Sequence, residues 1–382
     1  MDTVNRPSNI CFLRWIRWMD TINGIHLHDD SRLACAFEYI FFALQLVQLL
    51  FAYNFTMICF NTVSLEEFAE QFNQFGGVLL TFLRVGVIVS SCFPSTPEAA
   101  GFINASKFNH LNERAEHIRS GTIRNAGRFL STLLTVQIVT LLFWFAITEV
   151  QSQQQDVLLP ILTHQPFDAS RWPTYAKVAF RLYVYLSYTQ LMLTFFGSYI
   201  ITSSYLLMLT IELRILNDSY ATAPADPQQL VTFLKDRVVY KVELLHHIQL
   251  IKRQMNMSIL LELVFVVCLL AINGLRLCTT TSHLSEVALS SSMIFIYLLE
   301  LFQYCWQVDE MELLHQTQAF AAYSTPWVGA MKQTKALQLI TIRMAQVPLC
   351  FMCGGMYQIS TELFASVVQF IYSLVMMLLH FK

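Results

Sequence analysis

The feature that most restricts the fold of this sequence is a series of long, nearly uncharged apolar segments. The chain is 55% hydrophobic and only 13% charged over 382 residues, with 30 Phe, which is more hydrocarbon than water-soluble domains of ordinary size can bury. A helix needs about 20 apolar residues to cross the hydrocarbon core of a bilayer. The segments that approach this length are Leu33–Ile58, Phe75–Phe93, Phe129–Val150, Val178–Leu209, Ile259–Leu277, Leu284–Gln307 and Tyr357–Phe381. They are continuous rather than short and alternating, which favours helices over a transmembrane β-barrel. We therefore predict an all-α membrane protein with seven transmembrane helices.

Lys and Arg residues are unequally distributed between the two sides of these spans. Eighteen lie in the N-terminal segment and after spans two, four and six, against four on the other side. Because positive residues are retained in cytoplasmic segments, this asymmetry predicts a cytoplasmic N-terminus and, after seven crossings, an extracellular C-terminus. Residues 1–32 have no apolar core ahead of a small-residue cleavage site, so we expect no cleavable signal peptide. The predicted topology is opposite to that of rhodopsin-like receptors and argues against the alternative of a metabotropic seven-helix receptor.

The segments between the spans divide the chain into regions. We predict a cytoplasmic N-terminal segment (1–32), transmembrane helices 1–4 (33–210), a cytoplasmic helical extension (211–258), transmembrane helices 5–6 (259–307), cytoplasmic anchor helices (308–355) and a last helix (356–382). In the extension, Phe233, Val238, Val242, Leu245 and Ile248 recur at helical spacing with charges between them. Amphipathic helices must bury their apolar stripes against each other or against a partner, so a cytoplasmic helical bundle is expected.

Five charged residues fall in apolar surroundings, namely Arg84, Glu149, Arg181, Glu262 and Glu300. A charge at membrane depth usually faces protein or water, whereas a long side chain near a helix end can reach the interface. We favour the interfacial interpretation for Glu149 and Arg181. For Arg84 and Glu262, a functional role and an interfacial position both stay open.

The remaining polar residues do not form a pattern typical of a catalytic or metal site. His246-His247 lacks a carboxylate or Cys partner at metal-binding spacing, and Cys350-x-x-Cys353 has no second pair. No glycine-rich phosphate loop occurs, and Ser290-Ser291-Ser292 has no adjacent base. We therefore predict no enzyme activity, no metal site and no cofactor, and we expect the lipid bilayer rather than nucleic acid as a partner.

The C-terminal third carries a more specific pattern. It consists of Phe302, Tyr304 and Cys305 at the end of span six, then Ala321, Tyr323 and Trp327, then Arg343, Pro348, Leu349 and Gly354, and finally Phe364, Tyr372 and Ser373 in the last helix. Over roughly Leu301–Lys382 this pattern resembles the C-terminal signature of insect odorant receptors. Gustatory receptors are the nearest alternative, because their last helix typically carries Thr-Tyr, five apolar residues and Gln-Phe. This chain has Gln369-Phe370, but Glu362-Leu363 stands where Thr-Tyr belongs.

The resemblance implies an odorant-gated, non-selective cation channel in the plasma membrane of a sensory neuron dendrite, with four subunits around one pore. This chain would be the odorant-tuned subunit, assembled with the shared odorant receptor coreceptor in a hetero-oligomer. It is not expected to be the coreceptor, whose loop between spans four and five is longer than Arg214–Gln254. The family gate lies in the last two turns of a pore-lining helix 7, which implies pore roles for Met377, His380 and Phe381.

The resemblance also implies an odorant site in the outer half of the bundle formed by spans two, three, four and six. With the orientation above, the residues expected there are Phe75, Leu79, Leu83, Leu141, Trp144, Thr148, Tyr185, Tyr188, Met192, Val287, Ala288, Ser291 and Phe295. Within each span they recur every three or four residues, so each set could form one inward stripe. Small aromatic or heteroaromatic volatiles suit such walls.

Overall fold

The computed structural model describes residues 39–40, 43–61, 65–90, 113–155, 158, 167, 172–279 and 284–380, and these are almost entirely helical. The main helices are α3 (Gln48–Phe60), α4 (Leu65–Ser90), α7 (Glu113–Gln155), α8 (Thr174–Ser219), α9 (Pro227–Thr279), α10 (Leu284–Tyr323), α11 (Lys332–Gln346) and α12 (Thr361–His380). A 3₁₀ turn, η1 (Tyr220–Thr222), follows α8. Two short strands, β1 (Met352–Cys353) and β2 (Tyr357–Gln358), form an antiparallel hairpin before α12. The predicted all-α fold is confirmed.

Five segments of the described helices are long and apolar enough to cross a membrane. They are Ala43–Phe60, Glu113–Val150, Thr174–Thr222, Ile259–Cys278 and Thr361–His380. Predicted spans two and six coincide with α4 and α10, which are helical but are not among these five. The beginning of predicted span one and the last three residues of predicted span two lie outside the described residues.

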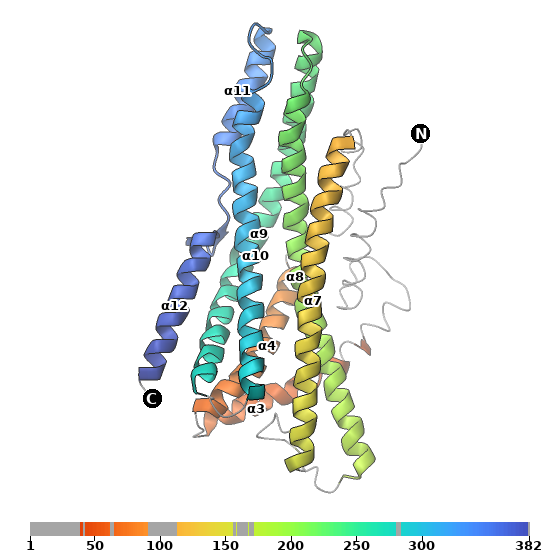
Figure 1. The fold of residues 1–382 in the computed structure, drawn as a ribbon, viewed down its shortest axis with the longest axis vertical. Helices are drawn as coiled ribbons and strands as arrows, with labels where there is room; N and C mark the ends of the chain where they lie inside the picture. Colours follow the sequence, from red (N-terminus) through yellow and green to blue (C-terminus); the bar gives the residue numbers. More distant parts are fainter. Residues whose placement is uncertain are drawn as a thin grey trace.

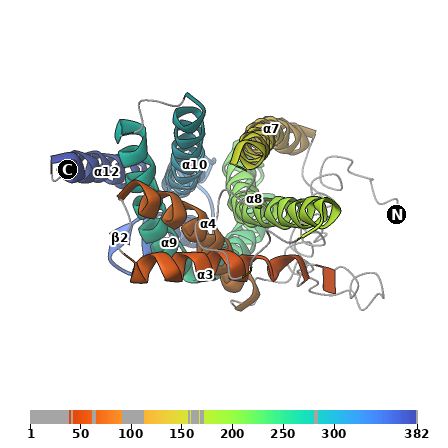
Figure 2. The same cartoon turned by 90° about the horizontal axis from the view of Figure 1, so that it is seen from below.

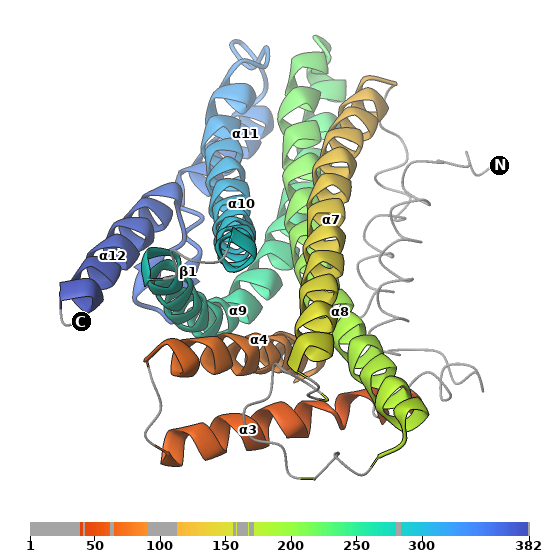
Figure 3. The same cartoon turned by 60° about the horizontal axis from the view of Figure 1, so that its bottom comes forward.

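The helices form an elongated bundle in which α8, α9 and α10 are central (Figure 1). At one end, upper in Figure 1, α8 to α11 rise together, whereas α3 and α4 lie at the opposite end, crossing beneath the other helices (Figure 3). The largest core forms between α8, α9 and α10, where Tyr199, Leu244 and Cys305 are fully buried. Seen from below, α12 stands at one edge of the molecule (Figure 2).

The turn between α8 and α9 is determined by two residues. The Asp226 carboxylate accepts a hydrogen bond from the Gln229 N–H at 3.3 Å, and Pro227 occupies the first helical position, where no N–H is needed. The helices on either side are 46 and 53 residues long. At 1.5 Å per residue they are about 70 and 80 Å long, which exceeds a hydrocarbon core of about 30 Å. Each therefore continues well beyond its apolar segment.

The last helix begins later than the sequence predicts. The predicted span starts at Tyr357, but Tyr357 and Gln358 belong to β2 and the helix begins at Thr361. Gly354 and Gly355 have φ of +61° and +70°, a left-handed conformation that reverses the chain and that glycine adopts without strain. The Ser360 hydroxyl then accepts a hydrogen bond from the Leu363 N–H at 3.2 Å, as a helix cap does. Because the residues of the hairpin are mostly apolar, composition could not distinguish the hairpin from the start of the helix.

Helix α12 is attached to the rest of the chain on one side only. It packs against α9 and α10, and Val367 and Val375 are its buried residues. Large apolar side chains elsewhere on the helix are exposed, with Phe370 at 58% and Tyr372 at 66%. The apolar surface of α12 is therefore available to lipid or to another protein chain.

Candidate functional site

A cluster of aromatic and aliphatic side chains joins α3, α4, α7 and α8, and we call it the Trp144 cluster. Its buried members are Val47, Phe51, Val78, Trp144, Leu158, Val184, Tyr188 and Leu191. The rings of Trp144 and Tyr188 stack with centroids 4.3 Å apart, and the Tyr188 hydroxyl donates to the Gln74 side-chain oxygen at 2.8 Å. Aromatic surface with few polar groups is the usual lining of a site for small apolar ligands.

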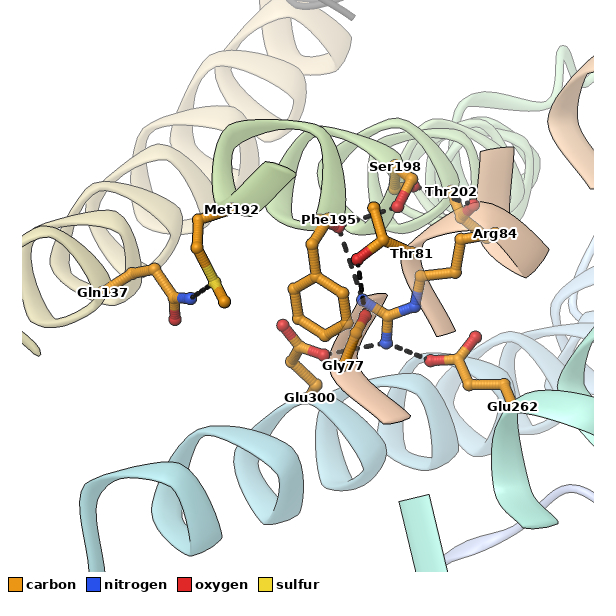
Figure 4. Close-up of polar contacts among 10 residues, drawn as sticks. All are labelled: Gly77, Thr81, Arg84, Gln137, Met192, Phe195, Ser198, Thr202, Glu262 and Glu300. Atoms are coloured by element: carbon orange, nitrogen blue, oxygen red, sulfur yellow. Dashed lines mark hydrogen bonds and ion pairs between the residues drawn. The ribbon is translucent and has the colours of Figure 1, made fainter. Parts of the chain in front are cut away.

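Next to this cluster, Gln137 of α7 reaches Met192 of α8 (Figure 4). The Gln137 amide nitrogen lies 3.4 Å from the Met192 sulfur, a weak acceptor. The Gln137 side-chain oxygen is buried and has no hydrogen-bond partner among the described residues. A buried acceptor without a donor is unusual, so this oxygen is available to a donor from a ligand or water.

Four helices meet at Arg84, on α4 (Figure 4). One guanidinium nitrogen, Nη2, donates both to Glu262 of α9 and, at 2.9 Å, to Glu300 of α10. The guanidinium carbon lies 3.9 Å from the ring centre of Phe195, on α8. The side chains of Arg84, Glu262 and Glu300 are 6%, 17% and 2% exposed. Arg84 therefore pairs inside the protein rather than reaching the membrane interface.

The structure brings several predicted ligand residues together. Trp144 and Tyr188 belong to the Trp144 cluster, and the half-buried Leu141 and Met192 pack against it. Thr148 is buried one turn after Trp144, to whose carbonyl it donates at 2.9 Å. Tyr185 lies beside them, because its ring is 4.7 Å from that of Phe145, and its hydroxyl donates to Glu149 at 3.1 Å. The predicted residues of spans three and four thus form one continuous surface.

The predicted residues of spans two and six lie elsewhere. Phe75 stacks on Phe55 at 4.8 Å, and Leu79 and Leu83 are half-buried along α4. On α10, Val287 and Ala288 are half-buried, Ser291 is exposed with its hydroxyl bonded to its own helix, and Phe295 is 55% exposed. At the same level of α10, Met293, Ile294 and Tyr297 are among the residues that pack against the other helices.

Gln74, Val78, Gln137 and the inward face of α10 were not among the residues predicted from the sequence. A helix that is apolar all round gives no periodic signal for which face is inward. Polar residues inside an apolar run were the available signal, because they are placed against protein rather than lipid. Gln137 carries that signal in the sequence.

Two of the three predicted pore residues, Met377 and His380, lie in the last turn of α12. Met377 is 49% exposed and His380 is also exposed, whereas Phe381 lies outside the described residues. At the other end of α12, a groove of about 480 Å³ is lined by Asp309, Tyr357, Gln358, Ser360, Thr361, Glu362, Leu363 and Ser366. There the Asp309 carboxylate accepts a hydrogen bond from the Thr361 N–H at 2.7 Å and so fixes the start of α12 on α10.

A second polar cluster lies beyond the apolar segments, among α9, α10 and α11. Lys241 is fully buried, and its Nζ has no hydrogen-bond partner in the described part of the chain. Burial without a counter-charge disfavours the ammonium and lowers the pKa of Lys241 to about 8. Burial, together with the Lys241 charge, also lowers the pKa of His315, whose Nε2 lies 2.9 Å from the Val347 carbonyl. Within the described ranges, no group of three or more His, Cys, Asp or Glu is placed to hold a metal ion.

Comparison with known proteins gives a family match, a relative and two similar structures. The family model described as 7tm Odorant receptor matches residues 98–372. Odorant receptor 10 of Aedes albopictus is 30% identical over 106 residues, which are 26% of this chain and 28% of that protein, so the match spans little more than a quarter of the relative. The structure of the insect olfactory receptor OR5 from Machilis hrabei in complex with eugenol superposes with a TM-score of 0.82 at 14% identity, covering 98% of this chain and 99% of that one. The same receptor described without eugenol gives a TM-score of 0.73 over the same shares.

Proposed function

Because the chain belongs to the insect odorant receptor family, whose model matches residues 98–372, we propose that it is the odorant-binding subunit of a ligand-gated cation channel. Membership of this family, rather than of a gustatory or enzyme family, makes the protein a membrane receptor of olfaction. The finer statement, that odorant binding opens a non-selective cation pore shared with the coreceptor, is the proposal.

The Trp144 cluster is the proposed odorant site. The observation that carries the assignment is the stacked Trp144–Tyr188 pair, with Met192 and the buried Gln137 oxygen beside it. Aromatic faces would hold a small ring by contact and desolvation, while a buried acceptor would orient a donor group. The similar receptor from Machilis hrabei is described in complex with eugenol, a small aromatic molecule, which supports aromatic volatiles as the ligand class.

The pore is proposed to form along α12. The helix buries only a narrow face within its own chain, so a continuous apolar surface is left for partner subunits and lipid. A ring of bulky apolar side chains can close such a pore by dewetting. Met377 and Phe381 are proposed for that ring and His380 for the adjacent ion path, with each subunit of a tetramer contributing one of four equivalent positions.

The α10–α11 hairpin is the proposed contact with the coreceptor. It exposes Leu313, Phe320, Val328, Leu339 and Ile340, with Val328 at 83% and Phe320 at 78%. Exposed apolar surface of this extent marks interaction sites in soluble regions. By contrast, Leu245 and Ile248, singled out in the sequence, pack inside the subunit's own core. The exposed positions are therefore the ones to vary in an assembly experiment.

Recording from excised membrane patches tests the proposal most directly. Coexpression with the coreceptor should give odorant-evoked cation current without nucleotide, and the chain alone should give little current. Loss of the response in excised patches, together with loss in whole cells when G proteins are blocked, would instead support a metabotropic receptor.

A further inference from the structure

We infer that Arg84 is a positioning residue that sets the gating equilibrium by pairing alternatively with Glu262 on α9 or Glu300 on α10. The inference rests on the proposed channel function and concerns how a ligand at α8 influences α12. Arg84 touches neither the Trp144 cluster's stacked pair nor α12 in the contacts described above. It would act through the helices that it joins.

Two hydrogen-bonding groups, one on Arg84 and one on Glu300, have no partner among the described residues. Nη2 is shared between two carboxylates, while Arg84 Nε and Glu300 Oε1 are both buried without a partner in the described part of the chain. A guanidinium pairs most strongly with one carboxylate through two parallel N–H···O bonds. A modest reorientation would allow Nε and Nη2 both to face Glu300, at the expense of Glu262. The site therefore has two arrangements built from the same three side chains.

Burial separates the two arrangements energetically, because a position between them would leave a buried carboxylate poorly paired. A carboxylate that loses its partner inside protein is strongly destabilised, whereas one that can reach water is much less so. Glu262 is the more exposed of the two carboxylates, at 17% against 2% for Glu300. Releasing Glu262 thus requires α9 to shift toward a more hydrated position, and releasing Glu300 requires a change at α10. Each arrangement of Arg84 corresponds to a different placement of one helix.

On the ligand side, the connection runs through α8. Besides the ring contact, Arg84 Nη1 donates to the Phe195 carbonyl at 3.4 Å, so both the side chain and the backbone of Phe195 touch the guanidinium. Phe195 lies one helical turn after Met192 and two turns after Tyr188. A ligand that displaces these two side chains or tilts α8 would change the position of Phe195 relative to Arg84.

On the pore side, α9 and α10 hold α12 at different points. Asn256 of α9 accepts from the N–H groups of Gly354 and Gly355, at 2.7 and 2.8 Å, and so anchors the β1–β2 hairpin. Helix α10 holds α12 through the Asp309 carboxylate, which accepts from the Thr361 N–H. It also holds α12 through Phe302, whose ring centre lies 5.4 Å from that of Phe364. A shift of α9 relative to α10 therefore changes how the hairpin and the start of α12 are held. The relative position of α9 and α10 is therefore the element that connects the ligand site to the pore helix.

The test compares Glu262→Gln with Glu300→Gln, each coexpressed with the coreceptor. Both substitutions keep side-chain size but remove the charge that favours one arrangement, so they should shift the odorant EC50 in opposite directions, each by about two- to thirtyfold. Arg84→Lys keeps the charge but cannot form the fork, and in that background the difference between the two Gln variants should disappear. Glu310→Gln is the matched control, because its ion pair with Arg214 also joins α8 to α10, but Arg214 has no second carboxylate among its described partners. It should leave the EC50 unchanged.

EC50 shifts in the same direction, or unchanged EC50 values at normal surface expression, would overturn the inference. A second readout does not depend on current. In purified receptor, hydrogen exchange at residues 352–358 should rise with Glu262→Gln, which frees α9, and fall with Glu300→Gln, which leaves Glu262 as the sole partner. Equal exchange in the two variants also contradicts the inference. If the wild-type receptor gives no current but the two Gln variants change hydrogen exchange in opposite directions, the proposed channel function is refuted. The alternative pairing of Arg84 is then still supported.

Discussion

At the level of single residues, Trp144 offers the most direct test of the odorant site. A large aromatic side chain buries 150–250 Å², and loss of roughly 100 Å² of ligand contact at ~25 cal/mol per Å² corresponds to about 2.5 kcal/mol, or roughly a sixtyfold loss of affinity. Trp144→Ala should therefore move the dose–response curve to higher concentration without changing relative ion permeability. Phe143→Ala is the control, because Phe143 is exposed on the same helix. An altered permeability with a fixed dose–response curve would contradict this assignment.

Lys241 gives a prediction about pH. Its folded-state pKa of about 8 lies below the usual 10.5, so at pH below 8 the folded protein carries a buried ammonium that the unfolded chain exposes to water. Between about pH 8 and 10.5 the unfolded state binds the additional proton, and stability rises with pH by about 3 kcal/mol in total. Lys241→Met should raise the melting temperature at pH 7.5 and remove this rise. Lys235→Met, at an exposed position on the same helix, should retain it. Melting curves of purified receptor between pH 7 and 10 distinguish the two outcomes.

At the level of elements, the close contact between α9 and α12 depends on Gly274, which has no side chain. A Cβ at Gly274 would lie 2.9 Å from the Val375 Cγ2, so Gly274→Ala should push α12 away from α9. We expect altered spontaneous open probability in single-channel recordings, because α12 is the proposed pore helix. Adding Val375→Ala removes the clashing methyl groups and should restore the wild-type value. If the double variant behaves like Gly274→Ala alone, close packing of these helices is not what controls the pore.

The elements also show what the sequence could and could not predict. Long apolar runs identified α7, α8, the apolar half of α9 and α12, because their length and composition leave few alternatives to a membrane helix. Helix phase was not predictable for α4 and α10, so the sequence could not show that Phe75 stacks on Phe55 or that Phe295 is exposed. Nor could the sequence pair Arg84 with Glu262 and Glu300, since a pairing across 178 and 216 residues leaves no local pattern.

At the level of the whole molecule, the orientation in the membrane is still a prediction. The excess of Lys and Arg in the N-terminal segment and after even-numbered spans predicts that Met1 is cytoplasmic and Lys382 extracellular. An epitope tag before Met1 should be unreachable by antibody in intact cells, and one after Lys382 should be labelled. Labelling of the N-terminal tag in intact cells would reverse the sides assigned to the odorant site and the α10–α11 hairpin.

The position of Arg84 also has a consequence for biosynthesis. Arg84 is made long before its partners, because Glu262 and Glu300 follow it by 178 and 216 residues. At 5–20 residues per second, translation of that interval takes about 10 to 40 s. During this time α4 lacks both carboxylates that pair with its guanidinium, and an unpaired charge in a predicted membrane span opposes insertion by several kcal/mol. We therefore predict that the nascent chain keeps α4 in the translocon, at the interface or on a chaperone until α9 and α10 emerge.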